Sequence, residues 1–258
     1  MLWKFYKHDP DICSYLMGTM HLATKEAYTY ADIAKKYILK AAVYAGEMNL
    51  GESVDEDLTS FFLSPGGKLF QENFRPKVYK KYQTLVRKCY DISLDDYKRY
   101  TPFYINNLLA EAALPAVHHQ PLDQYLWEFA VHNNRITTGV ESLRDQIDIL
   151  QNIPMDYQIK AFRDNMKNIK AFRHKLLSIN AMYADGQYRQ LYKSTQKSMG
   201  KIRNLMIYDR NKKMANAIIR MSDEKSSFFA IGAAHFAGNK GILAFLKKEG
   251  YKIKQITH

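Results

Sequence analysis

Two histidines follow the same short pattern near opposite ends of the chain. Gly18-Thr-Met-His21 and Gly232-Ala-Ala-His235 each come after an apolar segment, so each imidazole is expected where a buried strand ends. In sheets covered by helices, ligand sites are built at strand ends. Two imidazoles there can bind a divalent cation or transfer protons. Either histidine alone also fits a structural role, and the repetition is what points to a site.

Two glutamates occupy comparable positions, Glu47 in Ala45-Gly-Glu-Met-Asn49 and Glu141 in Gly139-Val-Glu-Ser142. A hydrolytic metal site usually has three protein ligands and one open position. We therefore predict that His21, His235 and one glutamate bind the metal, while the other glutamate accepts a proton from water. Glu141 is favoured as the ligand and Glu47 as the base, although the two roles can be exchanged. The other histidines are predicted to be surface or structural residues: His8, His118, His119, His132, His174 and His258.

The first third of the chain predicts strands and one helix, followed by a helical insert. Residues 2–8 suggest an edge strand, 14–20 a buried strand, and 41–48 a third strand. Thr24 is a candidate N-cap for the helix between the second and third strands. Residues 51–120 differ, with a turn at Ser64-Pro-Gly-Gly67, a helix from Pro76 towards Tyr90, and one or two shorter helices over 91–113.

The rest of the chain alternates helices with single strands. The pattern predicts helices over 122–134 and 241–248, and strands over 135–140, 226–234 and 251–258. Ser142, with Asp145 three residues later, is typical of a helix start. One longer amphipathic helix is expected from Phe162 to Ile179, and another one or two helices within 186–221.

Length and composition limit the possible classes of protein. The chain has 258 residues, 47% of them apolar, which fits one large domain or a core with a sizeable insert. We predict a single domain over 1–258 with the helical insert at about 51–120. Two cysteines, Cys13 and Cys89, exclude a disulfide scaffold. No apolar run approaches a membrane span, and residues 1–8 lack the apolar block of a signal peptide, so a cytoplasmic location is expected.

The positive charge is concentrated in one region. The formal net charge is +12, and residues 157–213 contain 14 Lys or Arg but only three Asp. A basic helical segment can bind nucleic acid or attract an acidic substrate, or it can be a solvated helix face. No DNA- or RNA-binding motif accompanies it, so no specific nucleic-acid partner is expected.

The ordered set of motifs resembles the TraB/GumN family, which is related to the TIKI metalloproteases and more distantly to the erythromycin esterase/ChaN-like fold. The resemblance covers nearly the whole chain. It is carried by Leu2-Trp-Lys4, Ser14 to His21, Glu47, Leu122 to Leu126, Thr138 to Ser142 with Gln146, Arg210-Asn211 with Met214-Ala215, and Phe229 to His235. The usual Gly-Leu-Glu of the family is Gly139-Val-Glu141 here, which keeps the acid in place.

The resemblance implies an α/β fold, with a central mixed β-sheet flanked by helices and a helical insert. It also implies one pocket that contains His21, Glu47, Glu141, Arg210, Asn211 and His235. The TIKI relatives are metal-dependent proteases, so the resemblance implies a divalent metal ion (Mn, Co or Zn) and a peptide or other small-molecule substrate. Arg210 and Asn211 would then bind substrate or polarise the scissile carbonyl. Tyr125 is a lesser candidate for substrate binding.

A second hypothesis uses the same pocket without catalysis. The resemblance extends to TraB and PrgY relatives linked to peptide-pheromone control, which implies that the pocket can capture a peptide or small anion. The two hypotheses differ in their prediction for substitution, because only the enzyme loses turnover when His21 or His235 is changed.

Overall fold

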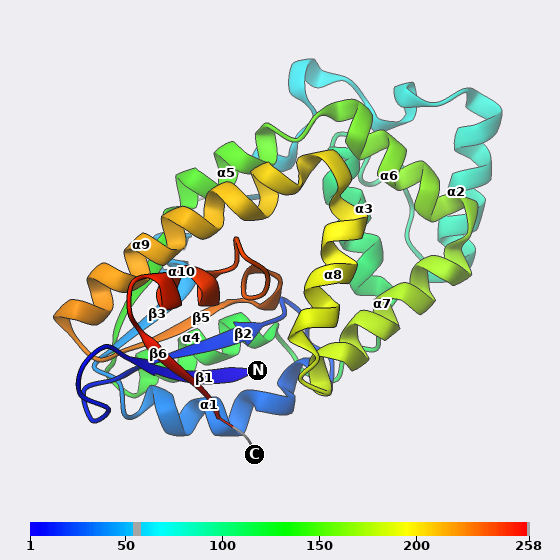
Figure 1. Ribbon diagram of the computed structural model, residues 1–258. Coiled ribbons are helices and arrows are strands. Elements are labelled where there is room, and N and C mark those ends of the chain that lie inside the picture. The colour runs from blue at the N-terminus through cyan, green and yellow to red at the C-terminus, as the bar shows by residue number, and fades with distance from the viewer. Residues whose placement is uncertain (54–57, 257–258) are drawn as a thin grey trace. The chain divides into compact units, whose positions relative to one another are not determined.

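A computed structural model describes residues 1–53 and 58–256. Its centre is a six-stranded mixed β-sheet with the strand order β4-β3-β5-β2-β1-β6 (Figure 1). The α/β fold expected from the sequence is confirmed. Residues 54–57 of the predicted insert and residues 257–258 of the predicted last strand lie outside the described residues. The strands are β1 (Leu2–Tyr6), β2 (Ser14–Thr19), β3 (Val43–Met48), β4 (Ile136–Glu141), β5 (Ser227–Gly232) and β6 (Lys252–Ile256).

The described chain divides into two compact units. One contains residues 1–53, 116–149 and 179–256, and the other contains 58–115 and 150–178. The first unit holds the sheet and these helices: α1 (Ala31–Ile38), α4 (Leu122–His132), α5 (Leu143–Gln151, to residue 149), α8 (Tyr188–Met199), α9 (Asp209–Glu224) and α10 (Ile242–Lys248). The second holds α2 (Pro76–Tyr90), α3 (Pro102–Ala112) and α6 (Met155–Lys167). Helix α7 (Ile169–Ala184) begins in the second unit and ends in the first.

Four neighbouring strands of the sheet run parallel, and this arrangement positions the site. β2 and β5 are aligned with Thr19 opposite Gly232, and β3 and β4 with Met48 opposite Glu141. β3 also pairs in parallel with β5, whereas β1 is antiparallel to both β2 and β6. The prediction that residues 2–8 form an edge strand is therefore wrong, because the alternating C-terminal segment adds outside β1.

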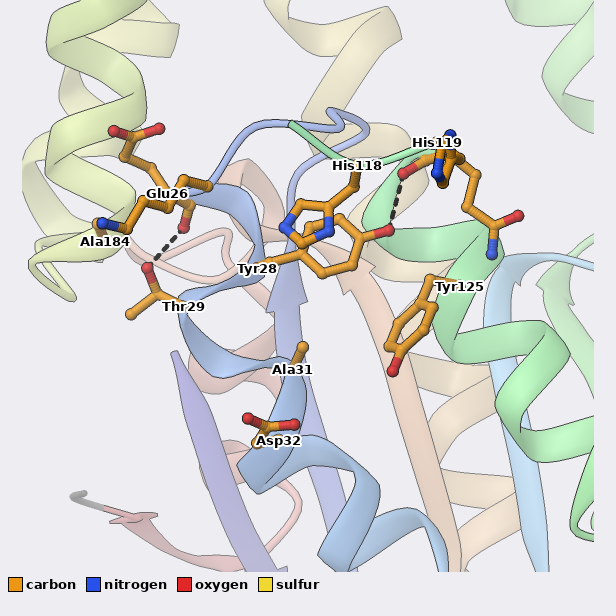
Figure 2. Close-up of a pocket in the computed structure, with 11 residues that line it drawn as sticks. Glu26, Tyr28, Thr29, Ala31, Asp32, His118, His119, Tyr125 and Ala184 are labelled. Atoms are coloured by element: carbon orange, nitrogen blue, oxygen red, sulfur yellow. Dashed lines mark hydrogen bonds between the residues drawn. The ribbon is translucent and has the colours of Figure 1, made fainter. Parts of the chain in front are cut away.

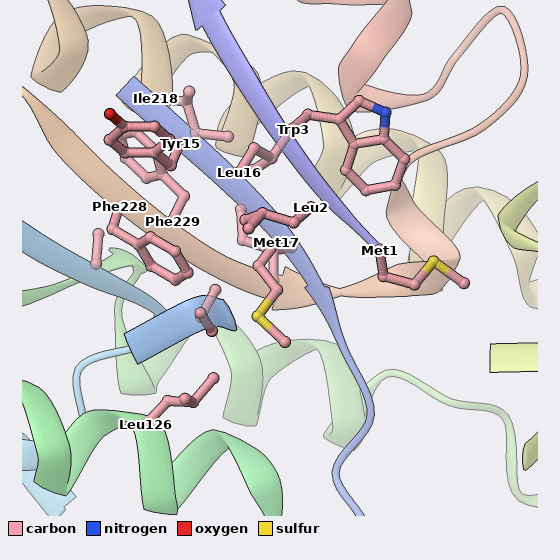
Figure 3. Packing of buried hydrophobic residues seen from close by; sticks show 14 of the residues in the cluster. Met1, Leu2, Trp3, Tyr15, Leu16, Met17, Leu126, Ile218, Phe228 and Phe229 are labelled. Atoms are coloured by element: carbon pink, nitrogen blue, oxygen red, sulfur yellow. The ribbon is translucent and has the colours of Figure 1, made fainter. Parts of the chain in front are cut away.

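The core lies on both faces of this sheet. β2 is buried along its whole length, and Phe228 and Phe229 of β5 are fully buried on opposite faces. Figure 3 shows Leu126 of α4 on one side of these strands and Ile218 of α9 on the other. α1 packs with α4, and α9 packs with α10 (Figure 1). Since two strands are buried on both faces, their sequences read as continuous apolar runs.

Local sequence signals explain several element boundaries. Thr24 Oγ1 accepts a hydrogen bond from Ala27 N at 3.2 Å, as expected of a cap. Ser142 and Asp145 form a reciprocal pair at the start of α5, with Asp145 N donating to Ser142 Oγ at 3.1 Å. At the other end of the chain, Gly250 adopts φ +87° just after α10, a conformation that glycine takes without strain.

The second unit has its own apolar cluster, which includes Phe70, Phe74, Tyr79 and Phe162. Phe70 packs edge to face against the other three rings, whereas Phe74 and Tyr79 are stacked. The single long helix predicted over 162–179 is two helices, α6 and α7. They are separated at Asn168, whose side chain accepts a hydrogen bond from Ala171 N at 3.0 Å. This local capping bond competes with continuing the helix. Across 1–53 and 58–256, none of the helices is both long and apolar enough to span a bilayer.

Candidate active site

The carboxyl ends of the four parallel strands bring distant residues together. Glu47 lies near the end of β3, Glu141 ends β4, and His235 lies in a short 3-10 turn (Ala233–His235) directly after β5. Parallel strands in register end at the same edge of a sheet, so the acids and the imidazole meet although they are far apart in sequence. Helix α9 crosses above this edge and adds Arg210 and Asn211, both buried.

Arg210 bridges the two glutamates. Its Nε donates to Glu141 Oε1 and Oε2 at 3.0 and 3.1 Å, and its Nη2 donates to Glu141 Oε2 at 2.5 Å. The same Nη2 also donates to Glu47 Oε1. Only 2% of the Glu141 side chain and 10% of the Arg210 side chain are exposed, against 25% for Glu47. Solvent therefore reaches this cluster through Glu47.

The charges of the cluster are unequal. Burial raises the pKa of the Glu47 carboxyl, but Arg210 and the Gly232 N–H, which donates to Oε2 at 2.8 Å, oppose it and the pKa falls to about 2. Burial, with repulsion from Glu47, raises the pKa of Glu141 despite the guanidinium. Burial also lowers the pKa of Arg210, but the two carboxylates more than offset it, and the guanidinium stays charged. Because the two carboxylates repel each other beside one guanidinium, Glu141 takes up a proton more readily than Glu47.

Asn211 determines which nitrogen of His235 carries the proton. The amide Nδ2 donates to the carbonyl oxygen of Lys240 at 2.6 Å, so the amide oxygen faces His235. Asn211 Oδ1 lies 2.6 Å from His235 Nδ1 and can only accept. The imidazole therefore holds its proton on Nδ1 and a lone pair on Nε2. Burial lowers the pKa of His235 to about 4, with Arg210 adding and Glu47 opposing, so the ring is neutral at pH 7.

Gly232 explains why Glu47 and His235 approach each other. A Cβ at this position would lie 3.0 Å from Glu47 Oε2 and 3.6 Å from His235 Cδ2. At Gly18, the equivalent glycine of the first motif, a Cβ would lie 3.0 Å from the Cβ of Ala233. Both glycines are therefore needed for close approach, one for the carboxylate and one for packing the two motifs side by side.

His21 has different surroundings. Its side chain is 72% exposed, and its Nδ1 lies 3.6 Å from Asp123 Oδ2. In the described part of the chain, no three or more His, Cys, Asp or Glu side chains are close enough to hold a metal ion. The predicted ligand set of His21, Glu141 and His235 is thus not assembled. Carboxylates and imidazole are suitable donors for Mn, Co or Zn, but Arg210 already holds both carboxylates, and these residues as arranged do not fit a metal ion.

Tyr125, the other predicted substrate-binding residue, lines a cavity of about 870 Å³ (Figure 2). The stacked rings of Tyr28 and His118, with centroids 3.6 Å apart, form part of the wall, and Tyr28 Oη donates to the Gln120 carbonyl at 2.7 Å. Tyr125 Oη accepts a hydrogen bond from Lys35 Nζ at 3.3 Å. The lining of this cavity does not include Arg210, Asn211, His235 or either glutamate of the cluster.

The site contains groups that residue types alone did not identify. The Gly232 N–H and the Lys240 carbonyl act through the backbone, so no side-chain pattern indicates them. Gln146, five residues after Glu141, points its Nε2 towards both glutamates at 3.4–3.5 Å. Asp123 faces His21. In the sequence it lies in the segment Leu122 to Leu126, which carries the family resemblance, but no role was predicted for it.

Comparisons with known proteins agree with this arrangement of motifs. The family model described as "TraB/PrgY/gumN family" matches residues 1–255. The chain is 22% identical to a protein named "Metalloprotease TIKI homolog" from Nematostella vectensis over 99% of its length, and 23% identical to "Metalloprotease TIKI1" from Danio rerio over 98%. It is also 22% identical to "Metalloprotease TIKI1" from Homo sapiens over 98%.

The chain spans 66%, 62% and 61% of the lengths of these three relatives. No solved structure matches it. A family model that matches nearly every residue, together with relatives aligned along the full chain, leads to one assignment: the chain belongs to the TraB/PrgY/gumN family.

Proposed function

We propose that the protein is a hydrolase that cleaves peptide bonds at the cluster of Glu47, Glu141, Arg210, Asn211 and His235. The observation that carries the proposal is a neutral imidazole with a defined lone pair on Nε2, beside an ionised carboxylate that is open to solvent. The names of the relatives, metalloproteases, support peptide bonds as the substrate class.

In this proposal His235 is the general base. A water molecule at Nε2 gives its proton to the imidazole as it attacks the peptide carbonyl, and the imidazolium later returns that proton to the leaving amine. Asn211 holds the ring in the required tautomer, and ionised Glu47 stabilises the imidazolium when it forms. Arg210 holds Glu47 and Glu141 in place. Because its guanidinium is already engaged, capture of an acidic ligand by Arg210 is the less favoured alternative.

The test is cleavage of a peptide library by the purified full chain, read by mass spectrometry. We expect defined cleavage products from the wild type and none from Glu47→Gln or His235→Ala, whereas Glu249→Gln, an exposed acid after α10, keeps full activity. Products formed equally by all the variants, or by none including the wild type, contradict the proposal.

A second experiment tests whether cleavage needs a metal ion, as the names of the relatives suggest. The protein is dialysed against a chelator, and Mn, Co or Zn is then added back separately. Cleavage that survives chelation assigns the reaction to His235 and the carboxylates. Cleavage that returns only with one of the ions assigns that ion, and requires that the bridge from Arg210 to the glutamates opens when the ion binds.

A further inference from the structure

We infer that Asp123 is a positioning residue for His21, fixing the imidazole with its proton on Nδ1 and its lone pair on Nε2. No part of the Arg210 cluster is needed for this inference. The consequence for catalysis does rest on the proposed function: positioned by Asp123, His21 is a second oriented base at the same edge of the sheet.

Asp123 has an unsatisfied carboxylate oxygen. It lies in the first turn of α4, where the helix dipole stabilises negative charge. Its Oδ2 is buried and has no hydrogen-bond partner in the described structure, although the side chain as a whole is 25% exposed. A buried carboxylate oxygen without a donor is costly, so such an oxygen calls for a specific partner.

The neighbouring tyrosines do not supply that donor. After burial, nearby charges that include Asp123 contribute to raising the pKa of Tyr28 and Tyr183, so both rings lie within its electrostatic reach. Their hydroxyls, however, donate elsewhere: Tyr28 Oη to the Gln120 carbonyl, and Tyr183 Oη to the Gly18 carbonyl at 2.8 Å. The group that faces Asp123 Oδ2 is His21 Nδ1, at 3.6 Å.

The backbone holds the two residues next to each other. The segment after His21 accepts three hydrogen bonds from the segment that leads into α4: Leu122 N donates to Leu22 O at 3.1 Å, and Val117 N and His118 N donate to Ala23 O at 2.9 and 3.0 Å. With both segments tied in this way, a side-chain rotation that shortens the distance by about 0.7 Å gives an ordinary N–H···O hydrogen bond.

A carboxylate accepts but cannot donate, and this decides the tautomer. When Asp123 accepts from Nδ1–H, the lone pair of His21 is on Nε2. The same logic applies to His235, where Asn211 Oδ1 accepts from Nδ1. The two Gly-x-x-His motifs lie on adjacent parallel strands, with Thr19 opposite Gly232. Each motif thus places an imidazole at the same sheet edge. In each case a side chain from another part of the chain, Asp123 or Asn211, accepts from Nδ1–H.

The experiment is ¹⁵N NMR of the histidine side chains in the full chain, recorded at about pH 8.5, where an imidazole of ordinary pKa is neutral. We expect His21 of the wild type to show the Nδ1–H tautomer, and Asp123→Ala to shift it to the Nε2–H tautomer that a histidine side chain without such a partner prefers. Glu128→Gln is the matched control, because Glu128 lies on the same helix and is held by Gln120 and Gln124; His21 keeps its wild-type signals there.

Two results overturn the inference: an Nε2–H tautomer for His21 in the wild type, or the same tautomer in the wild type and in Asp123→Ala. Asp123→Asn keeps the side-chain shape and serves if the alanine variant is poorly folded. Where peptide cleavage is measurable, we expect Asp123→Ala to lower kcat about 10–100-fold with KM changed less than about twofold. A confirmed tautomer without any cleavage contradicts the proposed function and leaves the positioning role intact.

Discussion

Burial of neutral His235 makes the first unit sensitive to mild acid. The fall in the pKa of His235 from its usual 6.5 to about 4 is caused by burial, with Arg210 adding to it and Glu47 opposing it. Between these two pH values the unfolded chain protonates the imidazole while the folded chain does not. The unfolded state therefore binds more protons, and the free energy of unfolding rises with pH through this range.

The size of the effect follows from the same values. At about 1.4 kcal/mol per pH unit, a pKa of about 4 in place of 6.5 corresponds to about 3 kcal/mol, present above pH 6.5 and lost by pH 4. His235 is only 4% exposed, so screening by solvent reduces this little. Glu47, with a pKa of about 2, adds a loss in the same direction, but only at pH values below its usual 4.5.

The assay is urea unfolding of the wild type and His235→Gln from about pH 7.5 to about pH 4.5. Tryptophan fluorescence is the right signal, because Trp3 and Trp127, the two tryptophans of the chain, are both buried in the first unit. We expect the wild type to lose about 2–3 kcal/mol more than the variant over this range.

His174→Gln is the control, since this histidine is exposed on α7. Its curve should follow that of the wild type. Parallel pH dependence of the wild type and His235→Gln would refute the reasoning, because it would mean that His235 is protonated as easily in the folded chain as in the unfolded one.

Three further substitutions test other parts of the structure. Arg210→Gln leaves Glu47 and Glu141 without their counter-ion, and should lower the free energy of unfolding in urea at pH 7 by about 3–5 kcal/mol. A decrease below about 1 kcal/mol would argue against the bridge. Mn should also raise the melting temperature of this variant more than that of the wild type. In Gly232→Ala the added methyl group contacts Glu47 Oε2, which should lower the free energy of unfolding by about 1–3 kcal/mol and peptide cleavage by about 10–100-fold. Unchanged cleavage would show that the carboxylate position is unimportant. Phe229→Ala empties a fully buried position in β5 and should cost about 3–5 kcal/mol by the same fluorescence measurement, whereas a cost under 1 kcal/mol would mean that the core refills the space.

The local elements of the fold follow from short-range patterns. β2 and β5 are apolar along their length, Pro76 starts α2, and Ser142 with Asp145 starts α5. Each of these signals lies within a few residues, so the sequence is sufficient to predict them. The prediction that β1 is an edge strand is wrong for the opposite reason. Its place in the sheet depends on where the C-terminal strand pairs, some 250 residues later.

The sequence by itself determined which residue types are available for chemistry: two imidazoles after glycine-containing strand ends, two glutamates after buried strands, and an Arg-Asn pair on a helix. Only the tertiary structure decided how they are used. Strand order places Glu47, Glu141 and His235 at one edge, and the approach of α9 gives both carboxylates to Arg210 and the Nδ1 of His235 to Asn211. His21 has the same local motif but is paired with Asp123 on α4. Protonation and hydrogen bonding depend on what lies across space, which residue spacing along the chain does not encode.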